Sequence, residues 1–136
     1  MLEKLESLVK EAQKAADIIR NHRGLIRAIS HVDCDGVCRA AIIVRALAKK
    51  RKLFHFSFAK YLDDATINGL VEEVKQGRWK LLVFTDLGSG AASGLAPILE
   101  YAKVIIADHH MPATKDGSEA KEEVDLRRAE IDRATY

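Results

Sequence analysis

The spacing of apolar residues along the chain changes several times, and each change marks a predicted element. Three segments have the three-to-four-residue spacing of amphipathic helices, namely 2–21, 37–50 and 64–76. Four shorter segments have the length and the apolar character of strands, namely 25–30, 53–58, 80–85 and 102–107. A short helix is predicted over 91–100, where Pro97 argues against a regular one.

The predicted helices and strands alternate, which favours a parallel sheet with helices on both faces. Two of the strands, 80–85 and 102–107, are nearly continuous apolar runs and therefore suit burial on both sides. The predicted fold is a three-layer α/β/α architecture with a mainly parallel sheet of about four strands. Beyond this core, residues 113–136 form a charged tail, predicted to be helical, whose thin apolar stripe is a candidate for self-association.

Bulk properties narrow the class of protein further. A chain of 136 residues, 48% hydrophobic and 31% charged, fits one globular domain. The net charge of +2 provides no large basic field, so a nucleic-acid role cannot be argued from charge. No run of about 18 apolar residues predicts a transmembrane helix, and the charged N-terminal segment is unlike a signal peptide. Cys34 and Cys38 suit free thiols, so we expect a cytoplasmic protein that is not membrane-bound.

Polar residues follow three of the four predicted strands at their carboxyl ends. The first strand runs into His31, Asp33 and Asp35, the third into Asp86, and the fourth into Asp108, His109 and His110. In open parallel sheets, ligands bind at this edge, so these side chains converge if the strands are neighbours. Grouped carboxylates cannot all stay ionised without positive charge, which a divalent cation supplies. A set rich in carboxylates favours manganese or magnesium over a structural zinc.

Two cations about 3.5–4 Å apart can share one bridging carboxylate and hold both sides of a phosphoryl displacement. Asp86 is the candidate bridge because it stands alone after a middle strand. Gly36 allows a tight turn into the next helix, whose N-terminus can face a phosphate. Gly88 and Gly90 leave room for a substrate beside Asp86.

Each cluster also has a simpler interpretation. Isolated acids often cap helices or begin turns, and Asp35 is placed to cap the helix that starts near Gly36. His55 alternates with phenylalanines on a predicted strand, which favours a structural or exposed histidine over a metal ligand. The metal site is therefore predicted from the convergence of three clusters and not from any one of them.

These clusters together resemble the motifs of a known family. The run from His31 to Gly36 resembles the first motif of the DHH phosphoesterases, H-x-D-x-D-G; Asp86 resembles the second, and Asp108-His109-His110 the third. The resemblance covers roughly residues 25–112 and is greatest to RecJ-like proteins, including archaeal relatives associated with the GINS replication complex.

The resemblance implies cleavage of phosphodiesters that depends on Mn²⁺ or Mg²⁺, and RecJ-like members are exonucleases of single strands. Carried over to this chain, the metal positions are His31, Asp33, Asp35, Asp86, Asp108 and His109. His110 matches the histidine near the scissile phosphate, so His110 and Asp108 are the expected catalytic residues.

The family also implies parts that have no counterpart in this sequence. Members usually have a fourth motif aspartate and then a second, substrate-binding domain, whereas only 26 residues follow His110. We therefore expect a catalytic-type domain over 1–112, comprising a helix over 1–22 and an α/β core over 25–112, without the second domain. The alternatives are a non-catalytic scaffold that binds GINS-type proteins, or a phosphatase acting on nanoRNA or a nucleotide.

Overall fold

The chain folds around a four-stranded sheet. The computed structural model describes residues 1–109. The strands are β1 (Ile26–His31), β2 (Phe54–Ala59), β3 (Leu81–Thr85) and β4 (Lys103–Ala107), in the spatial order β2-β1-β3-β4. Each neighbouring pair is parallel. The predicted parallel sheet of four strands is therefore confirmed.

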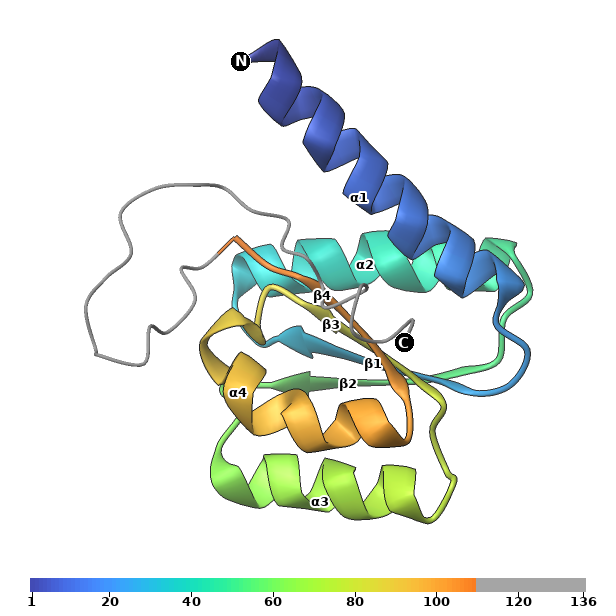
Figure 1. Cartoon of the computed structure of the whole chain (residues 1–136), viewed down its shortest axis with the longest axis vertical. Coiled ribbons are helices and arrows are strands. Elements are labelled where there is room, and N and C mark those ends of the chain that lie inside the picture. Colours follow the sequence, from blue (N-terminus) through green and yellow to red (C-terminus); the bar gives the residue numbers. More distant parts are fainter. Residues whose placement is uncertain (110–136) are drawn as a thin grey trace.

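Helices cover both faces of this sheet, as Figure 1 shows. α1 (Leu2–Asn21) and α2 (Cys34–Lys49) lie on one face, and α3 (Asp64–Lys75) and the short α4 (Ala92–Leu95) lie on the other. The three-layer architecture predicted from the sequence is confirmed, and it provides two separate cores, one on each side of the sheet.

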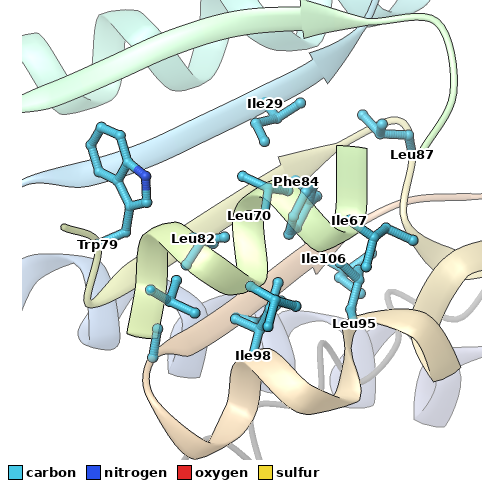
Figure 2. Packing of buried hydrophobic residues seen from close by; sticks show 14 residues of the cluster. Ile29, Ile67, Leu70, Trp79, Leu82, Phe84, Leu87, Leu95, Ile98 and Ile106 are labelled. Carbon is cyan, nitrogen blue, oxygen red and sulfur yellow. The ribbon is translucent and has the colours of Figure 1, made fainter. Parts of the chain in front are cut away.

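The larger core lies between the sheet and the α3–α4 layer (Figure 2). Phe84 of β3 and Ile98 are fully buried at its centre, and Ile67 and Leu70 project into it from α3. Side chains alternate across a strand, so the neighbours of Phe84 in β3 face the other way. Val83, for example, packs in the second core beneath α1 and α2. All five residues of β3 are buried, as expected for a strand covered on both faces.

The helix predicted over 91–100 is broken into three pieces. A 3-10 helix (Ser89–Ala91) leads into α4, and a second 3-10 helix (Ala96–Glu100) follows it. Pro97 lies in the first turn of the second piece, where its missing N–H removes no helical hydrogen bond. The prediction that Pro97 prevents a regular helix over 91–100 is confirmed.

The predicted start of the second helix, residue 37, is wrong by one turn. α2 begins at Cys34, and Asp33 is its N-cap, accepting a hydrogen bond from the Gly36 amide at 2.8 Å. Asp35 therefore lies within the first turn and is not the capping residue. The polar residues that resembled a loop in the sequence form a cap and a helical turn, because a capping aspartate precedes the helix by one position.

The order of the strands creates a switch point beside the centre of the sheet. After β1 the chain adds β2 on one side, and after α3 it returns to place β3 on the other side of β1. Connections therefore leave the carboxyl ends of β1 and β3 in opposite directions, which opens a crevice where ligands of such sheets bind. The acids at the ends of β1, β3 and β4 were predicted to converge only if these strands are neighbours. In the structure they are neighbours.

Two further features complete the described chain. The N-terminal half of α1 extends beyond the sheet in Figure 1, and Leu2, Leu5 and Val9 are exposed there. Among residues 1–109, no helix combines the length and the apolar character needed to cross a membrane. His110 and the predicted helical tail over 113–136 lie outside the described residues.

Candidate metal centre

The end of β1 supplies the first two candidate ligands. His31 is the last residue of the strand, and its Nδ1 lies 2.9 Å from Oδ2 of Asp33, the N-cap of α2. Their side chains are 26% and 51% exposed, although Nδ1 of His31 is itself buried against the end of the strand. The capping geometry thus places an acid and an imidazole together at the N-terminus of a 16-residue helix.

The pKa of the Asp33 carboxyl lies below its ordinary value. The main cause is the hydrogen bond donated by the Gly36 amide, and the neighbouring His31 lowers the pKa further. A carboxylate stabilised in this way is ionised at neutral pH and is ready to bind a cation without first losing a proton.

A close approach between backbones holds this corner together. A Cβ added at Gly36 would lie 2.0 Å from the carbonyl oxygen of His31, so only glycine fits between β1 and α2. The hydroxyl of Ser30, which is fully buried, lies 2.8 Å from the carbonyl oxygen of Gly36 and 3.1 Å from that of Thr85. The ends of β1, α2 and β3 therefore meet at one buried polar group.

Asp86 follows β3 directly and occupies the centre of the crevice. Its side chain is 1% exposed, and its backbone has a positive φ of 61°. This left-handed conformation is uncommon for a residue other than glycine, although aspartate tolerates it better than most, and such conformations concentrate at functional sites. The conformation turns the chain out of β3 while the Asp86 amide still donates to the Ala107 carbonyl at 2.9 Å.

The end of β4 supplies the third part of the site. Asp108 is 3% exposed, and its Oδ2 accepts a hydrogen bond from the Ser89 amide at 3.1 Å. Nε2 of His109 lies 3.1 Å from Oδ1 of Asp86, and the His109 side chain is 48% exposed. A buried acid and an accessible imidazole thus flank Asp86 on the side away from β1.

These residues form two groups that share one carboxylate. His31, Asp33 and Asp86 form the first group, and Asp86, Asp108 and His109 form the second. Within each group the candidate ligand atoms lie within 4.8 Å of one another. Five of the residues that the sequence nominated as ligands therefore lie together, and Asp86 occupies the shared position expected of a bridge.

Two nominated residues are not members of the groups found among residues 1–109. Asp35 is exposed in the first turn of α2 and belongs to neither group, so its role as a ligand stays a prediction. His110 lies outside the described residues, and its role also stays a prediction.

The two glycines after Asp86 have different surroundings. Gly88 has a φ of 116°, and a Cβ there would lie 3.1 Å from Cγ2 of Ile106, so glycine is required by the backbone and by a close neighbour. A Cβ at Gly90 would meet nothing within 4 Å. Open space beside the crevice is thus present at Gly90, whereas Gly88 shapes the turn.

Sequence reasoning missed two residues of the site, Arg39 and Ser30. The guanidinium of Arg39, on α2, hydrogen-bonds through Nη1 to Oδ1 of Asp86. Ser30 is a polar residue in an otherwise apolar strand, which is a sequence signal for a buried hydrogen bond. Arg39 gave a weaker signal, because arginines are ordinary residues on helix surfaces.

The surroundings of Asp86 fit a divalent cation. In the described part of the chain, its Oδ2 is buried and has no hydrogen-bond partner, and it lies 4.0 Å from Nδ1 of His31. A buried carboxylate oxygen without a partner is costly, and a cation bound between it and the His31–Asp33 pair would remove that cost. Carboxylate oxygens with imidazole nitrogens suit Mn²⁺ and, with fewer nitrogens, Mg²⁺.

The fold and the site together define a class: an α/β domain with a carboxylate–histidine centre at the topological switch point of its sheet. Comparison with known proteins identifies the family. The model of the DHH family, N-terminal domain, matches residues 25–135, and the chain belongs to this family. The match extends over most of the segment that the sequence predicted to be a separate tail.

Two relatives place the chain more closely. An uncharacterized protein of Methanocaldococcus jannaschii is 35% identical over 116 residues, which are 85% of this chain and 26% of that protein. The crystal structure of RecJ in complex with Mn²⁺ from Thermus thermophilus has a TM-score of 0.57 and 22% identity, covering 90% of this chain and 20% of that one. The fold is therefore RecJ-like, and the chain spans about a quarter or less of these relatives.

Proposed function

We propose that this chain is the metal-binding domain of a phosphoesterase that hydrolyses phosphodiesters of single-stranded nucleic acid, as RecJ-like exonucleases do. The observation that carries the proposal is the carboxylate of Asp86, shared by two groups of candidate ligands. Two cations held by one bridging carboxylate are the usual arrangement for in-line phosphoryl displacement. Membership of the DHH family and the likeness to a RecJ that binds Mn²⁺ favour Mn²⁺ or Mg²⁺ as the ions.

The ligands divide between the two groups described above. Bound cations would supply a water of lowered pKa and neutralise charge on the phosphate. The hydrogen bond from the Ser89 amide fixes the Asp108 carboxylate in the crevice. The carboxylate therefore does not need to reorganise when a cation binds. His109 faces the entrance, and we assign His110, the next residue, to proton transfer or to the scissile phosphate. Asp35 is proposed as a further ligand at the entrance.

The substrate is expected to enter over the first turn of α2 and the turn after β3. The N-terminus of α2 carries the positive end of the helix dipole, which favours a phosphate near Gly36. The open space at Gly90 leaves room for a nucleotide beside Asp86, and Gly88 provides the turn that creates it. These features support single-stranded nucleic acid or a short oligonucleotide as the ligand.

The domain division and the location are also proposals. We assign residues 1–112 to the catalytic-type domain and residues 113–136 to a tail that can mediate self-association. The exposed, free thiols of Cys34 and Cys38 favour a reducing compartment such as the cytoplasm.

The test is hydrolysis of single-stranded DNA and RNA oligonucleotides, labelled at either end, in the presence of Mn²⁺ or Mg²⁺. We expect release of nucleotides by the unmodified chain and its loss in Asp86→Asn. Glu6→Gln, which makes the same carboxylate-to-amide change on an exposed site of α1, should retain activity. Equal activity in Asp86→Asn and the unmodified chain would contradict the proposal.

Two other outcomes would point to different functions. Cleavage of a dinucleotide with no cleavage of longer strands would replace the exonuclease by a nanoRNA or nucleotide phosphatase. Binding of Mn²⁺ without cleavage of any substrate would contradict an enzymatic role for this chain. That result would favour the scaffold function, which capture of GINS-type proteins would then test.

A further inference from the structure

Arg39 brings a permanent positive charge into the centre of the site. It lies one turn beyond the N-terminus of α2, its side chain is 33% exposed, and its Nη1 hydrogen-bonds to Oδ1 of Asp86. A cation that needs Oδ1 of Asp86 therefore has to compete with Arg39.

The two oxygens of Asp86 differ in their partners. Oδ1 accepts the hydrogen bond from Arg39 and lies 3.1 Å from Nε2 of His109, so it faces the second group of ligands. Oδ2 is buried, has no hydrogen-bond partner among residues 1–109, and faces His31 of the first group. One side of the shared carboxylate is thus compensated by the protein itself, and the other side is not.

We propose that Arg39 makes the two cation positions unequal and sets the order in which they fill. The first cation binds between His31, Asp33 and Oδ2 of Asp86. The second group, formed by Asp86, Asp108 and His109, takes a cation only when the guanidinium of Arg39 has left Oδ1. The inference rests on the proposed metal centre but adds the residue that controls its occupancy.

The size of the effect follows from the bond that must break. A hydrogen bond between an arginine and a carboxylate is among the strongest in proteins. The guanidinium and a metal cation are both positive and repel each other, so they cannot both bind Oδ1 of Asp86. Because the guanidinium must be displaced, the second cation should bind roughly 10- to 100-fold more weakly than it would at a site without Arg39. The side chain can leave because it is one-third exposed and reaches solvent.

The experiment measures Mn²⁺ binding to the full chain by isothermal titration calorimetry. Electron paramagnetic resonance of the same samples distinguishes single Mn²⁺ ions from magnetically coupled pairs. Arg39→Met removes the charge with little change in volume, and Arg39→Lys keeps a charge but loses the planar fork. Arg45→Met makes the same charge change on an exposed site of α2 and is the matched control.

We expect two binding steps in the unmodified chain, separated by about tenfold or more in Kd. In Arg39→Met, the second step should tighten by about tenfold or more, the first should stay unchanged, and coupled pairs should appear at lower Mn²⁺. Arg39→Lys should lie between the two, and Arg45→Met should match the unmodified chain.

Three results would overturn the inference, and they are distinguishable. If the second Kd is the same in Arg39→Met as in the unmodified chain, Arg39 does not control the site, although the metal centre itself stands. If the first Kd changes instead, the order of filling is the reverse of the one proposed. If neither protein binds Mn²⁺, the metal centre fails together with the inference.

Discussion

Replacing Gly36 by alanine tests how closely α2 must approach β1 for the site to form. The added Cβ would lie 2.0 Å from the carbonyl oxygen and 2.6 Å from the carbonyl carbon of His31. Both are backbone atoms, so no rotation of a side chain can relieve the overlap. The first turn of α2 therefore has to move away from the end of β1.

The cost can be worked from the contacts that this movement disturbs. The buried hydroxyl of Ser30 lies 2.8 Å from the carbonyl of Gly36, and losing that hydrogen bond costs about 1 kcal/mol. Forcing an extra carbon into a closely packed region costs about 1–3 kcal/mol more. We expect Gly36→Ala to lower the free energy of unfolding by at least about 2 kcal/mol.

The assay is urea denaturation followed by fluorescence. Trp79 is the single tryptophan and is 5% exposed in the fold, so its emission reports unfolding directly. Gly69→Ala is the matched control, because a Cβ there meets nothing within 4 Å on the surface of α3. Alanine in a helix is more stable than glycine, so this control should gain about 0.5–1 kcal/mol.

The two glycine variants should therefore shift the urea midpoint in opposite directions. A midpoint for Gly36→Ala equal to that of the unmodified protein would refute the close packing of α2 against β1. Because His31 and Asp33 directly precede the disturbed turn, we also expect weaker Mn²⁺ binding in Gly36→Ala and unchanged binding in Gly69→Ala.

Four further predictions address the core, the polar junction, a helix cap and the metal centre. Ile98→Ala, at a fully buried position, should cost about 2–5 kcal/mol in urea denaturation, and a loss below about 1 kcal/mol would show that the site is not packed as described. Ser30→Ala removes the buried hydroxyl that donates to the Gly36 or the Thr85 carbonyl and should cost about 0.5–1.5 kcal/mol, whereas no loss would mean that water replaces the hydroxyl. The pKa of Asp63 lies below its ordinary value of 3.8 because the side chain and the backbone amide of Thr66 donate hydrogen bonds to it. The ionised Asp63 carboxylate stabilises α3 fully above its unfolded pKa, and this stabilisation disappears as pH falls through the lower folded pKa. The difference in Tm between the unmodified protein and Asp63→Ala should therefore shrink below about pH 4. A difference in Tm that does not depend on pH would argue against the carboxylate as the cap. Finally, Mn²⁺ should raise the Tm of the unmodified protein by preferential binding to the folded state, and Asp86→Asn should abolish that rise; an equal rise in both proteins would place the ion elsewhere.

The strands of the sheet were the most predictable part of the fold. β3 and β4 are apolar runs because helices cover both faces of the sheet, and such runs are short and bounded by polar residues. The order of helices and strands then leaves few topologies, since parallel strands need crossover helices. The sequence did not specify that β3 pairs with β1 and not with β2, because strand order depends on packing over the whole sheet.

Helix boundaries were less predictable for local reasons. Apolar periodicity begins only where a helix meets the core, so the polar first turn of α2, from Cys34, carries no such signal. The segment around α4 has apolar residues at helical spacing, yet it alternates between 3-10 and α-helical turns. Periodicity alone does not distinguish these two geometries over so few residues.

The acids of the site could be read from the sequence, whereas their positive partner could not. The position of an acid at a strand end is a local property, and parallel pairing brings all such ends to one edge. Contact between Arg39 and Asp86 instead joins residues 47 apart and depends on how α2 lies across the sheet. The buried residues of α2 include Gly36 and Ala40, and Arg39 lies three residues beyond Gly36, at the border of that face. An arginine at this spacing from the glycine that allows close contact is held over the end of the neighbouring strand. Gly36, which allows α2 to pack closely against β1, therefore also places the Arg39 guanidinium beside the Asp86 carboxylate. The charge balance of the centre depends on the packing of α2 as much as on the ligands.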